Sequence, residues 1–221
     1  MKLVIFDFEG TLVDFQWRLK AALDELHSRL EPLLAKAGIA PAALSGLDYC
    51  RLYNFLGAKI PDPALRRETL ALVDEVFDRF DADAADRWRL NPGARELLAF
   101  LKDSGFSLAL DSNVGRKALD RMLEKLALGA FFPVTVSRDE VFRLKPDPEG
   151  IGRIRAFFGR ELSPAAPALL VGDSVTDIET ARAAGISVAV ITNGEDRTAR
   201  LKAHTPDHLV ASLSELATIL G

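Results

Sequence analysis

The sequence has little cysteine, no long apolar run and no excess of positive charge. Its single cysteine, Cys50, cannot form an internal disulfide, which is typical of a reducing compartment such as the cytoplasm. No stretch approaches the roughly 18 uncharged apolar residues of a membrane helix, and the apolar start at residues 3–6 is too short for a signal peptide. Lys and Arg total 28 against 32 Asp and Glu, a balance that argues against nucleic acid. We therefore expect a cytoplasmic protein without a nucleic-acid or membrane partner.

The composition is that of a folded protein. Of the 221 residues, 48% are hydrophobic and 27% are charged, which provides enough apolar surface for a core and too little net charge for disorder. The length is above the usual size of one domain and below that of two equal ones. One core domain that carries a smaller insert is the expected organisation.

Short apolar runs that alternate with helical patterns predict the fold of the core. Such runs are typical of strands buried on both faces of a parallel sheet. They are found at residues 3–6, 106–110, 134–136, 169–171 and 188–191. Helical patterns lie between them at residues 94–104, 115–128, 149–158 and 177–184. This alternation predicts an α/β fold, a parallel sheet with helices on both faces.

About a hundred residues separate the first two expected strands, far more than one crossover helix requires. Apolar residues within this stretch recur at helical spacing, and prolines and glycines divide it into about four helices. We therefore expect residues 15–90 to form an inserted α-helical domain, and residues 1–14 and 91–221 to form the core domain.

Two pairs of acids follow two of the expected strands. Asp7 and Glu9 come directly after the first strand, and Asp173 and Asp177 follow the run at residues 169–171. Ligands of open α/β sheets bind at the carboxyl ends of the strands. Either pair alone could belong to an ordinary turn, with Gly10 making the first one. Together the two pairs can converge on one divalent cation.

With these motifs the chain resembles the haloacid dehalogenase-like hydrolases. Four segments match the family's motifs in the right order: Asp7-Phe8-Glu9-Gly10-Thr11-Leu12, Leu110-Asp111-Ser112-Asn113, Lys145-Pro146-Asp147-Pro148 and Gly172-Asp173-Ser174-Val175-Thr176-Asp177. The resemblance implies a Rossmann-like core. It also implies that residues 15–90 are a helical cap like that of the subgroup containing phosphoglycolate phosphatase and β-phosphoglucomutase.

The resemblance implies a role for each matching residue. Asp7 is the nucleophile that becomes phosphorylated, Glu9 is the general acid and base, and Lys145 neutralises the nucleophile and the transferred group. Asp7, Glu9 through its backbone carbonyl, Asp173 and Asp177 hold Mg²⁺, the expected cofactor, with Asp177 alternatively holding a water or pairing with the lysine. The expected substrate-binding residues are Thr11, which is also expected to order the Asp7 loop, Ser112, Asn113, Lys145 and, from the cap, Arg51.

Glu9 departs from the family pattern, which usually has aspartate there. Its carboxylate lies about one bond, ~1.5 Å, farther from the backbone. The expected function is hydrolysis of a small-molecule phosphate ester, phosphoglycolate-like or a sugar phosphate. Two alternatives stay open: a phosphotransferase like β-phosphoglucomutase, and a phosphate-binding regulatory module with low activity, which only Glu9 favours. The expected assembly is a monomer or homodimer.

Overall fold

The computed structural model describes residues 3–159, 166–192 and 194–220. The chain forms two compact units. Met1–Gln16 and Arg87–Gly221 form the first, called the core unit, and Trp17–Asp86 form the second, called the helical unit. The chain therefore leaves the core unit after Gln16 and returns to it at Arg87.

The core unit is built on one parallel sheet with the strand order β3-β2-β1-β4-β5-β6. The strands are β1 (Leu3–Phe6), β2 (Ser107–Asp111), β3 (Val134–Val136), β4 (Ala168–Gly172), β5 (Ser187–Ile191) and β6 (His208–Val210). The first five coincide with the predicted apolar runs, and every residue of β1, β2 and β4 is buried. The predicted α/β fold with a parallel sheet is confirmed, and β6 is an addition that the sequence did not reveal.

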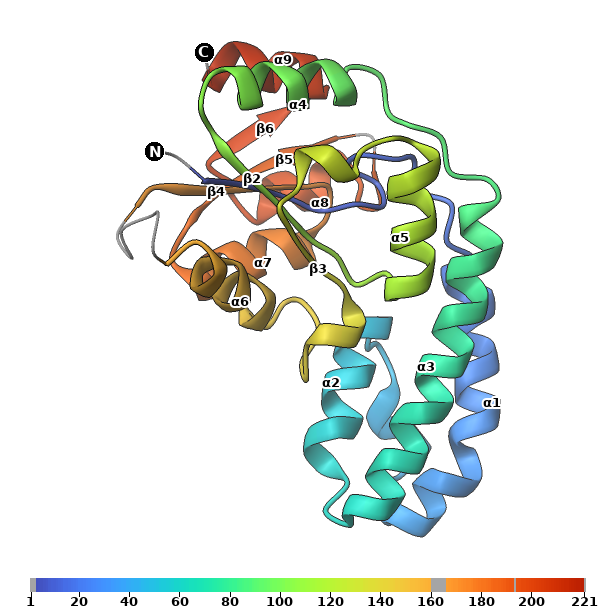
Figure 1. Cartoon of the computed structure of the whole chain (residues 1–221). Helices are drawn as coiled ribbons and strands as arrows, with labels where there is room; N and C mark the ends of the chain where they lie inside the picture. The colour runs from blue at the N-terminus through green and yellow to red at the C-terminus, as the bar shows by residue number, and fades with distance from the viewer. Residues whose placement is uncertain (1–2, 160–165, 193, 221) are drawn as a thin grey trace. The chain divides into compact units, whose positions relative to one another are not determined.

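Helices cover both faces of this sheet (Figure 1). Those of the core unit are α4 (Ala94–Asp103), α5 (Arg116–Lys125), α6 (Glu149–Phe157), α7 (Val175–Ala184), α8 (Thr198–Ala203) and α9 (Leu213–Leu220), with the short 3-10 turns η2 (Gly129–Phe131) and η3 (Arg138–Glu140). Apolar residues of α6 and α7 pack against Leu3 and Ile5 of β1 in one buried cluster. Helices α4 and α9 contact each other and lie side by side.

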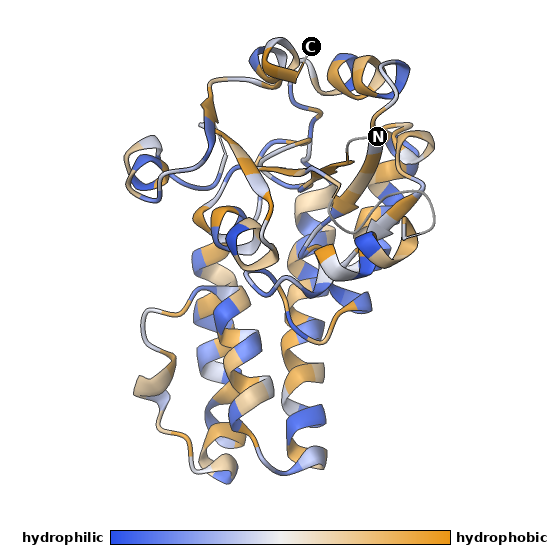
Figure 2. Ribbon diagram, turned by 90° about the vertical axis from the view of Figure 1, so that its left-hand side faces the viewer, coloured by the Kyte–Doolittle hydropathy of each residue, from blue (hydrophilic) through white to orange (hydrophobic). Residues whose placement is uncertain are grey.

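The helical unit consists of α1 (Leu19–Ala37), the 3-10 turn η1 (Pro41–Leu44), α2 (Tyr49–Lys59) and α3 (Pro63–Ala85). Apolar and polar residues alternate along its helices (Figure 2), and α3 contacts both α1 and α2. The Trp17 ring packs on Tyr49 and Phe77 with centroids 4.9 and 5.6 Å apart. Its indole Nε1 donates to Asp81 Oδ1 over 2.9 Å, so a buried aromatic cluster and one buried polar bond hold this unit.

None of the helices among the described residues is both long and apolar enough to cross a membrane.

The strand register places the ends of three strands at one level. Phe6 of β1 pairs with Leu110 of β2 on one side and with Val171 of β4 on the other. The Asp7 amide extends this ladder by donating to the Val171 carbonyl over 2.8 Å. Residues that follow these three strands therefore meet at one edge of the sheet.

Candidate active site

A cluster of buried carboxylates lies at that edge. Asp7 follows β1, and Asp173 and Asp177 follow β4, and each of the three is at most 7% exposed. One carboxylate oxygen from each residue lies within 4.8 Å of the other two. The structure thus brings together three of the four predicted metal ligands through their side chains.

Lys145 enters this cluster from the loop that follows β3. Its ammonium Nζ donates to Asp7 Oδ1 over 2.6 Å and to Asp177 Oδ1 over 2.8 Å. Its backbone amide donates to Asn113 Oδ1 over 3.1 Å, which fixes the point at which the side chain leaves the loop. A buried lysine held at both ends delivers a point charge to a defined place.

Asp177 owes its orientation to the start of α7. Ser174 caps this helix, and the Ser174 hydroxyl donates to Asp177 Oδ2 over 2.7 Å. The Ser174 amide donates to the same oxygen over 3.2 Å, which completes a capping box. One Asp177 oxygen thus serves the helix cap while the other accepts from Lys145.

Asp173 lies against a glycine that admits no side chain. Gly10 has a φ of +83°, and a Cβ built on it would lie 2.1 Å from Asp173 Oδ2. The Thr11 hydroxyl donates to Asp173 Oδ1 over 3.1 Å. The Glu195 amide donates to the other oxygen. Gly10 and Thr11 therefore bring the loop after β1 into contact with the end of β4.

Burial and mutual repulsion shape the electrostatics of the cluster. Burial raises the pKa of Asp7 from 3.8 to about 7, and Asp177 adds to the rise although Lys145 opposes it. Burial, then Asp7 and Asp177, raise the pKa of Asp173 well above its usual range. Burial by itself lowers the pKa of Lys145, but Asp177 and Asp7 outweigh it and the pKa is raised. The ammonium is therefore firmly charged, whereas Asp7 and Asp173 hold protons more readily than ordinary carboxylates, because with all three acids ionised the cluster would carry more negative charge than the ammonium offsets.

This imbalance fits a hard divalent cation. Three carboxylates are buried together and one ammonium contacts two of them, and carboxylate oxygens are the ligands that Mg²⁺ prefers. A cation bound there would oppose both the burial and the mutual repulsion that raise the pKa values of Asp7 and Asp173. The donor set therefore matches the predicted cofactor in chemistry.

Ser112 and Asn113 follow β2 and are buried beside the cluster. The Ser112 hydroxyl oxygen accepts from the Val114 amide over 3.2 Å. The Asn113 side-chain oxygen accepts from the Lys145 amide, and its backbone carbonyl accepts from Arg138 over 3.1 Å. Asn113 thus contacts the backbone of Lys145, and the contact of Ser112 and Asn113 with substrate stays a prediction. The buried Arg138 was not singled out from the sequence, where nothing distinguishes it from a surface arginine.

Asp111 ends β2 and turns toward α6. A Cβ built on Gly150 would lie 2.1 Å from Asp111 Oδ1, so the carboxyl group packs directly on the first turn of that helix. The other oxygen, Oδ2, is buried without a hydrogen-bond partner. Burial raises the pKa of Asp111 to about 6, against the opposing charge of Lys145.

Arg51, the substrate-binding residue predicted in the insert, lies on α2 of the helical unit. Its guanidinium group donates to Asp48, the residue that caps the start of α2. The structure therefore gives Arg51 a local partner, and its predicted contact with substrate stays a prediction.

Glu9 lies in the core unit with its side chain held by two donors. The Trp88 indole Nε1 donates to Glu9 Oε1 over 2.7 Å, and the Gln16 amide donates to the same oxygen over 2.9 Å. The contact with Trp88 was missed because 79 residues separate the two positions. A buried indole N–H requires a hydrogen-bond acceptor, and this requirement was the one indication in the sequence that Trp88 bonds to a polar side chain.

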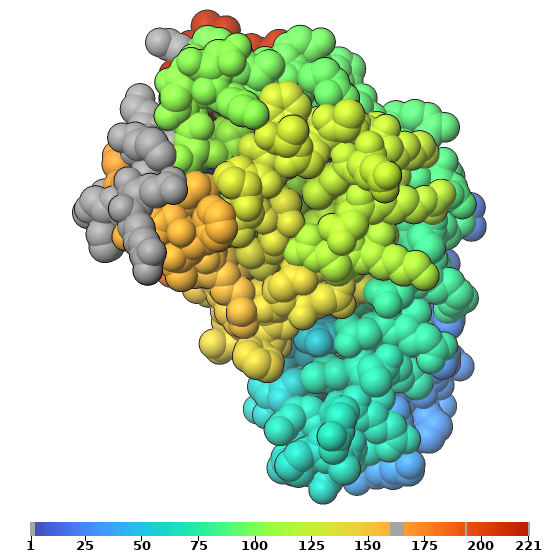
Figure 3. All heavy atoms as spheres, viewed as in Figure 1, coloured from blue at the N-terminus to red at the C-terminus, as the bar shows by residue number. Residues whose placement is uncertain are grey.

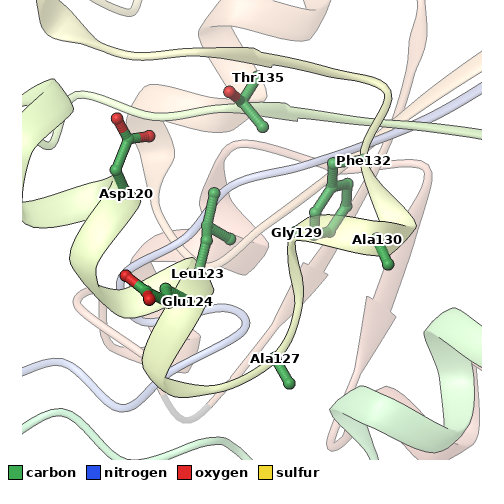
Figure 4. A pocket seen from close by; sticks show the side chains of 8 residues that line it. All are labelled: Asp120, Leu123, Glu124, Ala127, Gly129, Ala130, Phe132 and Thr135. Atoms are coloured by element: carbon green, nitrogen blue, oxygen red, sulfur yellow. The ribbon is translucent and has the colours of Figure 1, made fainter.

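The described part of the core unit also has a surface hollow of about 470 Å³ at the edge strand β3 (Figure 4). Asp120 and Glu124 from α5 line it together with Phe132 and Thr135. Figure 3 shows α5 and the segment after it at the surface on this side of the molecule. None of the candidate site residues lines the hollow, and its two acids disfavour the binding of an anion such as a phosphate ester.

Comparison with known proteins gives consistent results. The family model described as haloacid dehalogenase-like hydrolase matches residues 4–191. A phosphoglycolate phosphatase from Pseudomonas savastanoi pv. phaseolicola is 30% identical over 231 residues, covering 97% of this chain and 78% of the relative.

Two solved structures share the fold. One is a haloacid dehalogenase-like family hydrolase from Streptococcus pneumoniae, with a TM-score of 0.62, 19% identity and coverage of 99% of this chain and 98% of the other. The second is a predicted phosphatase from Clostridium acetobutylicum, with a TM-score of 0.68, 21% identity and coverage of 99% and 97%.

Proposed function

The chain belongs to the haloacid dehalogenase-like hydrolases, and from this membership we propose that it is a Mg²⁺-dependent phosphatase acting on a phosphate monoester of a small metabolite. The observation that carries the proposal is the buried contact of Lys145 Nζ with Asp7 Oδ1 over 2.6 Å. This contact puts a fixed positive charge beside a carboxylate at the carboxyl end of a parallel sheet. A relative named phosphoglycolate phosphatase supports 2-phosphoglycolate or a similar alkyl phosphate as the substrate.

Asp7 is the nucleophile of the first step. A carboxylate oxygen of Asp7 attacks phosphorus, the bond between phosphorus and the ester oxygen breaks, and the phosphoryl group stays on Asp7. Glu9 gives its proton to the departing ester oxygen, so that an alcohol leaves. Lys145 lies where it offsets the charge of Asp7 and of the phosphoryl oxygens during the transfer.

Water releases phosphate in the second step. Glu9, now a carboxylate, takes a proton from water, and the water oxygen attacks phosphorus. The bond between phosphorus and the Asp7 oxygen breaks, and Asp7 is regenerated as a carboxylate. Splitting hydrolysis in this way replaces one difficult step by two easier ones.

Asp7, Asp173, Asp177 and the backbone carbonyl of Glu9 are the residues that would hold Mg²⁺. When bound, the cation supplies positive charge that offsets the phosphoryl oxygens and orients the ester for in-line attack. Asp177 also accepts from Lys145, so it has the additional task of holding the lysine.

Phosphate oxygens are bound by Lys145, the Ser112 hydroxyl and the Asn113 amide, and Thr11 keeps the Asp7 loop on Asp173. We assign substrate selection to the insert at residues 15–90, the cap, and catalysis to residues 1–14 and 91–221. Arg51 is the candidate for binding a substrate carboxylate, for which it must exchange its bond with Asp48. We place the enzyme in the cytoplasm as a monomer or homodimer.

Turnover of phosphate esters with and without Mg²⁺ tests this function. We expect release of phosphate from p-nitrophenyl phosphate and from at least one member of a panel of glycolate, sugar and nucleotide phosphates, and loss of both activities with a chelator. Product analysis with a hexose phosphate distinguishes a phosphatase, which frees phosphate, from a phosphomutase, which moves it. Absence of turnover on every substrate with Mg²⁺ present would overturn the proposal and favour a binding module.

A further inference from the structure

The side chain of Glu9 is anchored by two neighbours at the places where the chain enters and leaves the core unit. The Trp88 indole and the Gln16 amide both donate to Glu9 Oε1, over 2.7 and 2.9 Å. Gln16 is the last residue before the helical unit, and Trp88 is the second residue after it. The position of the Glu9 carboxyl group thus depends on how the segment that leaves the core unit at Gln16 pairs with the segment that returns at Arg87.

The two crossings are held together by the backbone. Val13 and Leu90 form an antiparallel bridge, the Asp14 amide donates to the Arg89 carbonyl over 3.0 Å, and the Asn91 amide donates to the Leu12 carbonyl over 2.9 Å. These bonds fix the backbone directly after Trp88 against residues 12–14. Its position relative to the loop after β1 is therefore set by the core unit.

The Trp88 ring is held by packing as well as by its hydrogen bond. It is fully buried, with 0% exposure, and it packs edge to face on Phe8 with centroids 5.4 Å apart and an angle of 87°. Phe8 lies between Asp7 and Glu9 in the chain. One ring therefore fixes the residue next to the nucleophile through packing and one oxygen of the Glu9 carboxyl group, Oε1, through a hydrogen bond.

We propose that Trp88 is a positioning residue that holds the Glu9 carboxyl group at the distance required for proton transfer. The inference rests on the proposed function, in which Glu9 protonates the leaving group. A glutamate has one more freely rotating bond than an aspartate, and the bond from a rigid indole restricts that freedom. Since an error of about 1 Å in a reacting group can cost on the order of a hundredfold in rate, such an anchor has a measurable effect.

The leaving group of the substrate provides the test. An alkoxide leaves only with a proton, whereas p-nitrophenolate is stable enough to leave without one. The ratio kcat/KM covers the steps up to the departure of the leaving group. A weakened general acid therefore lowers kcat/KM for an alkyl phosphate and spares p-nitrophenyl phosphate, whereas general damage to the fold lowers both.

We expect Trp88→Phe to lower kcat/KM about tenfold or more for the best alkyl phosphate of the panel and less than about twofold for p-nitrophenyl phosphate. Trp17→Phe is the matched control, because it removes the other buried indole bond, the one to Asp81. It is expected to leave the ratio of the two kcat/KM values within about twofold of the wild type. Equal losses on both substrates in Trp88→Phe, or no loss at all, would overturn the proposal.

Glu9→Asp removes the same hydrogen bond by changing its acceptor, and it replaces Trp88→Phe as the test variant if Trp88→Phe does not fold. The shorter side chain cannot keep the bond to Trp88, so a selective loss on the alkyl phosphate is expected, and a gain would overturn the anchor. Asp7→Asn distinguishes the two hypotheses. Turnover by Asp7→Asn would overturn the proposed function, whereas an inactive Asp7→Asn beside an unchanged substrate ratio in Trp88→Phe would overturn the anchor alone.

Discussion

Replacement of Asp7 by asparagine is predicted to stabilise the metal-free protein at pH 8 while abolishing turnover. Burial is the largest cause that raises the pKa of this carboxyl group to about 7, from 3.8 in the unfolded chain. Between these two values the folded state binds more protons than the unfolded state. Stability is therefore greatest below pH 4 as far as this group is concerned, and it falls as the pH rises through about 7.

The magnitude follows from the same two values. A difference of about three pH units, at roughly 1.4 kcal/mol each, means that ionised Asp7 costs the fold about 4 kcal/mol. Asparagine has nearly the same shape and no charge, and its side-chain oxygen can still accept from Lys145. At pH 8 we expect the free energy of unfolding of Asp7→Asn to exceed that of the wild type by about 4 kcal/mol. At pH 4 the two are expected to agree.

Urea unfolding followed by circular dichroism, at pH 4 and pH 8 with a chelator present, measures both differences. Asp196→Asn is the matched control in the same unit. It replaces a buried aspartate that accepts from the Val175 amide over 2.8 Å and from Arg200 over 2.6 Å. It removes a paired charge and is expected to lower stability at pH 8. Two results would contradict a destabilising charge on buried Asp7: Asp7→Asn no more stable than the wild type at pH 8, or an equal loss of stability in both proteins between the two pH values.

Three further predictions concern the same cluster and its surroundings. Millimolar Mg²⁺ is expected to raise the thermal midpoint of the wild type and to raise that of Asp7→Asn less, because one ligand charge is gone; equal shifts in differential scanning fluorimetry would contradict this. Lys145→Met is expected to lower turnover by about a hundredfold or more and the free energy of unfolding at pH 8 by about 3 kcal/mol, since it leaves buried acids uncompensated; steady-state kinetics and urea unfolding check both losses. Gly150→Ala places a Cβ 2.1 Å from Asp111 Oδ1 and is expected to cost about 1–3 kcal/mol, most of which Asp111→Ala should restore in the double variant, as thermal unfolding will show.

The sheet was predictable from the sequence because its strands are nearly uniform apolar runs. All residues of β1 are buried, and a continuous apolar run such as Leu3–Phe6 is typical of a strand that is buried on both faces of a parallel sheet. Strand β6 was not predicted because it has three residues, begins with His208 and pairs with β5 alone. A strand at the edge of a sheet is buried less and therefore has a weaker apolar pattern.

The part of the site that was predictable consists of residues that directly follow the strands of the sheet. Asp7 and Asp173 come directly after paired strands, so register alone brings them together. Contacts between loops do not follow from such reasoning. The sequence does not indicate that Asn113 accepts from the Lys145 amide, that Arg138 is buried against Asn113, or that Trp88 donates to Glu9. Each of these depends on where a loop returns to the sheet, which is decided by packing over the whole core unit.

Chemical trapping tests most directly whether a phosphoryl group is transferred to Asp7. The enzyme is mixed with Mg²⁺ and substrate, quenched, reduced with borohydride and digested with trypsin, and the peptide of residues 3–18 is sequenced by mass spectrometry. Reduction of an acyl phosphate on aspartate leaves homoserine, and we expect homoserine at position 7 in the wild type and none in Asp7→Asn. Trapping at position 9, or an unmodified peptide in the presence of continuing turnover, would contradict it.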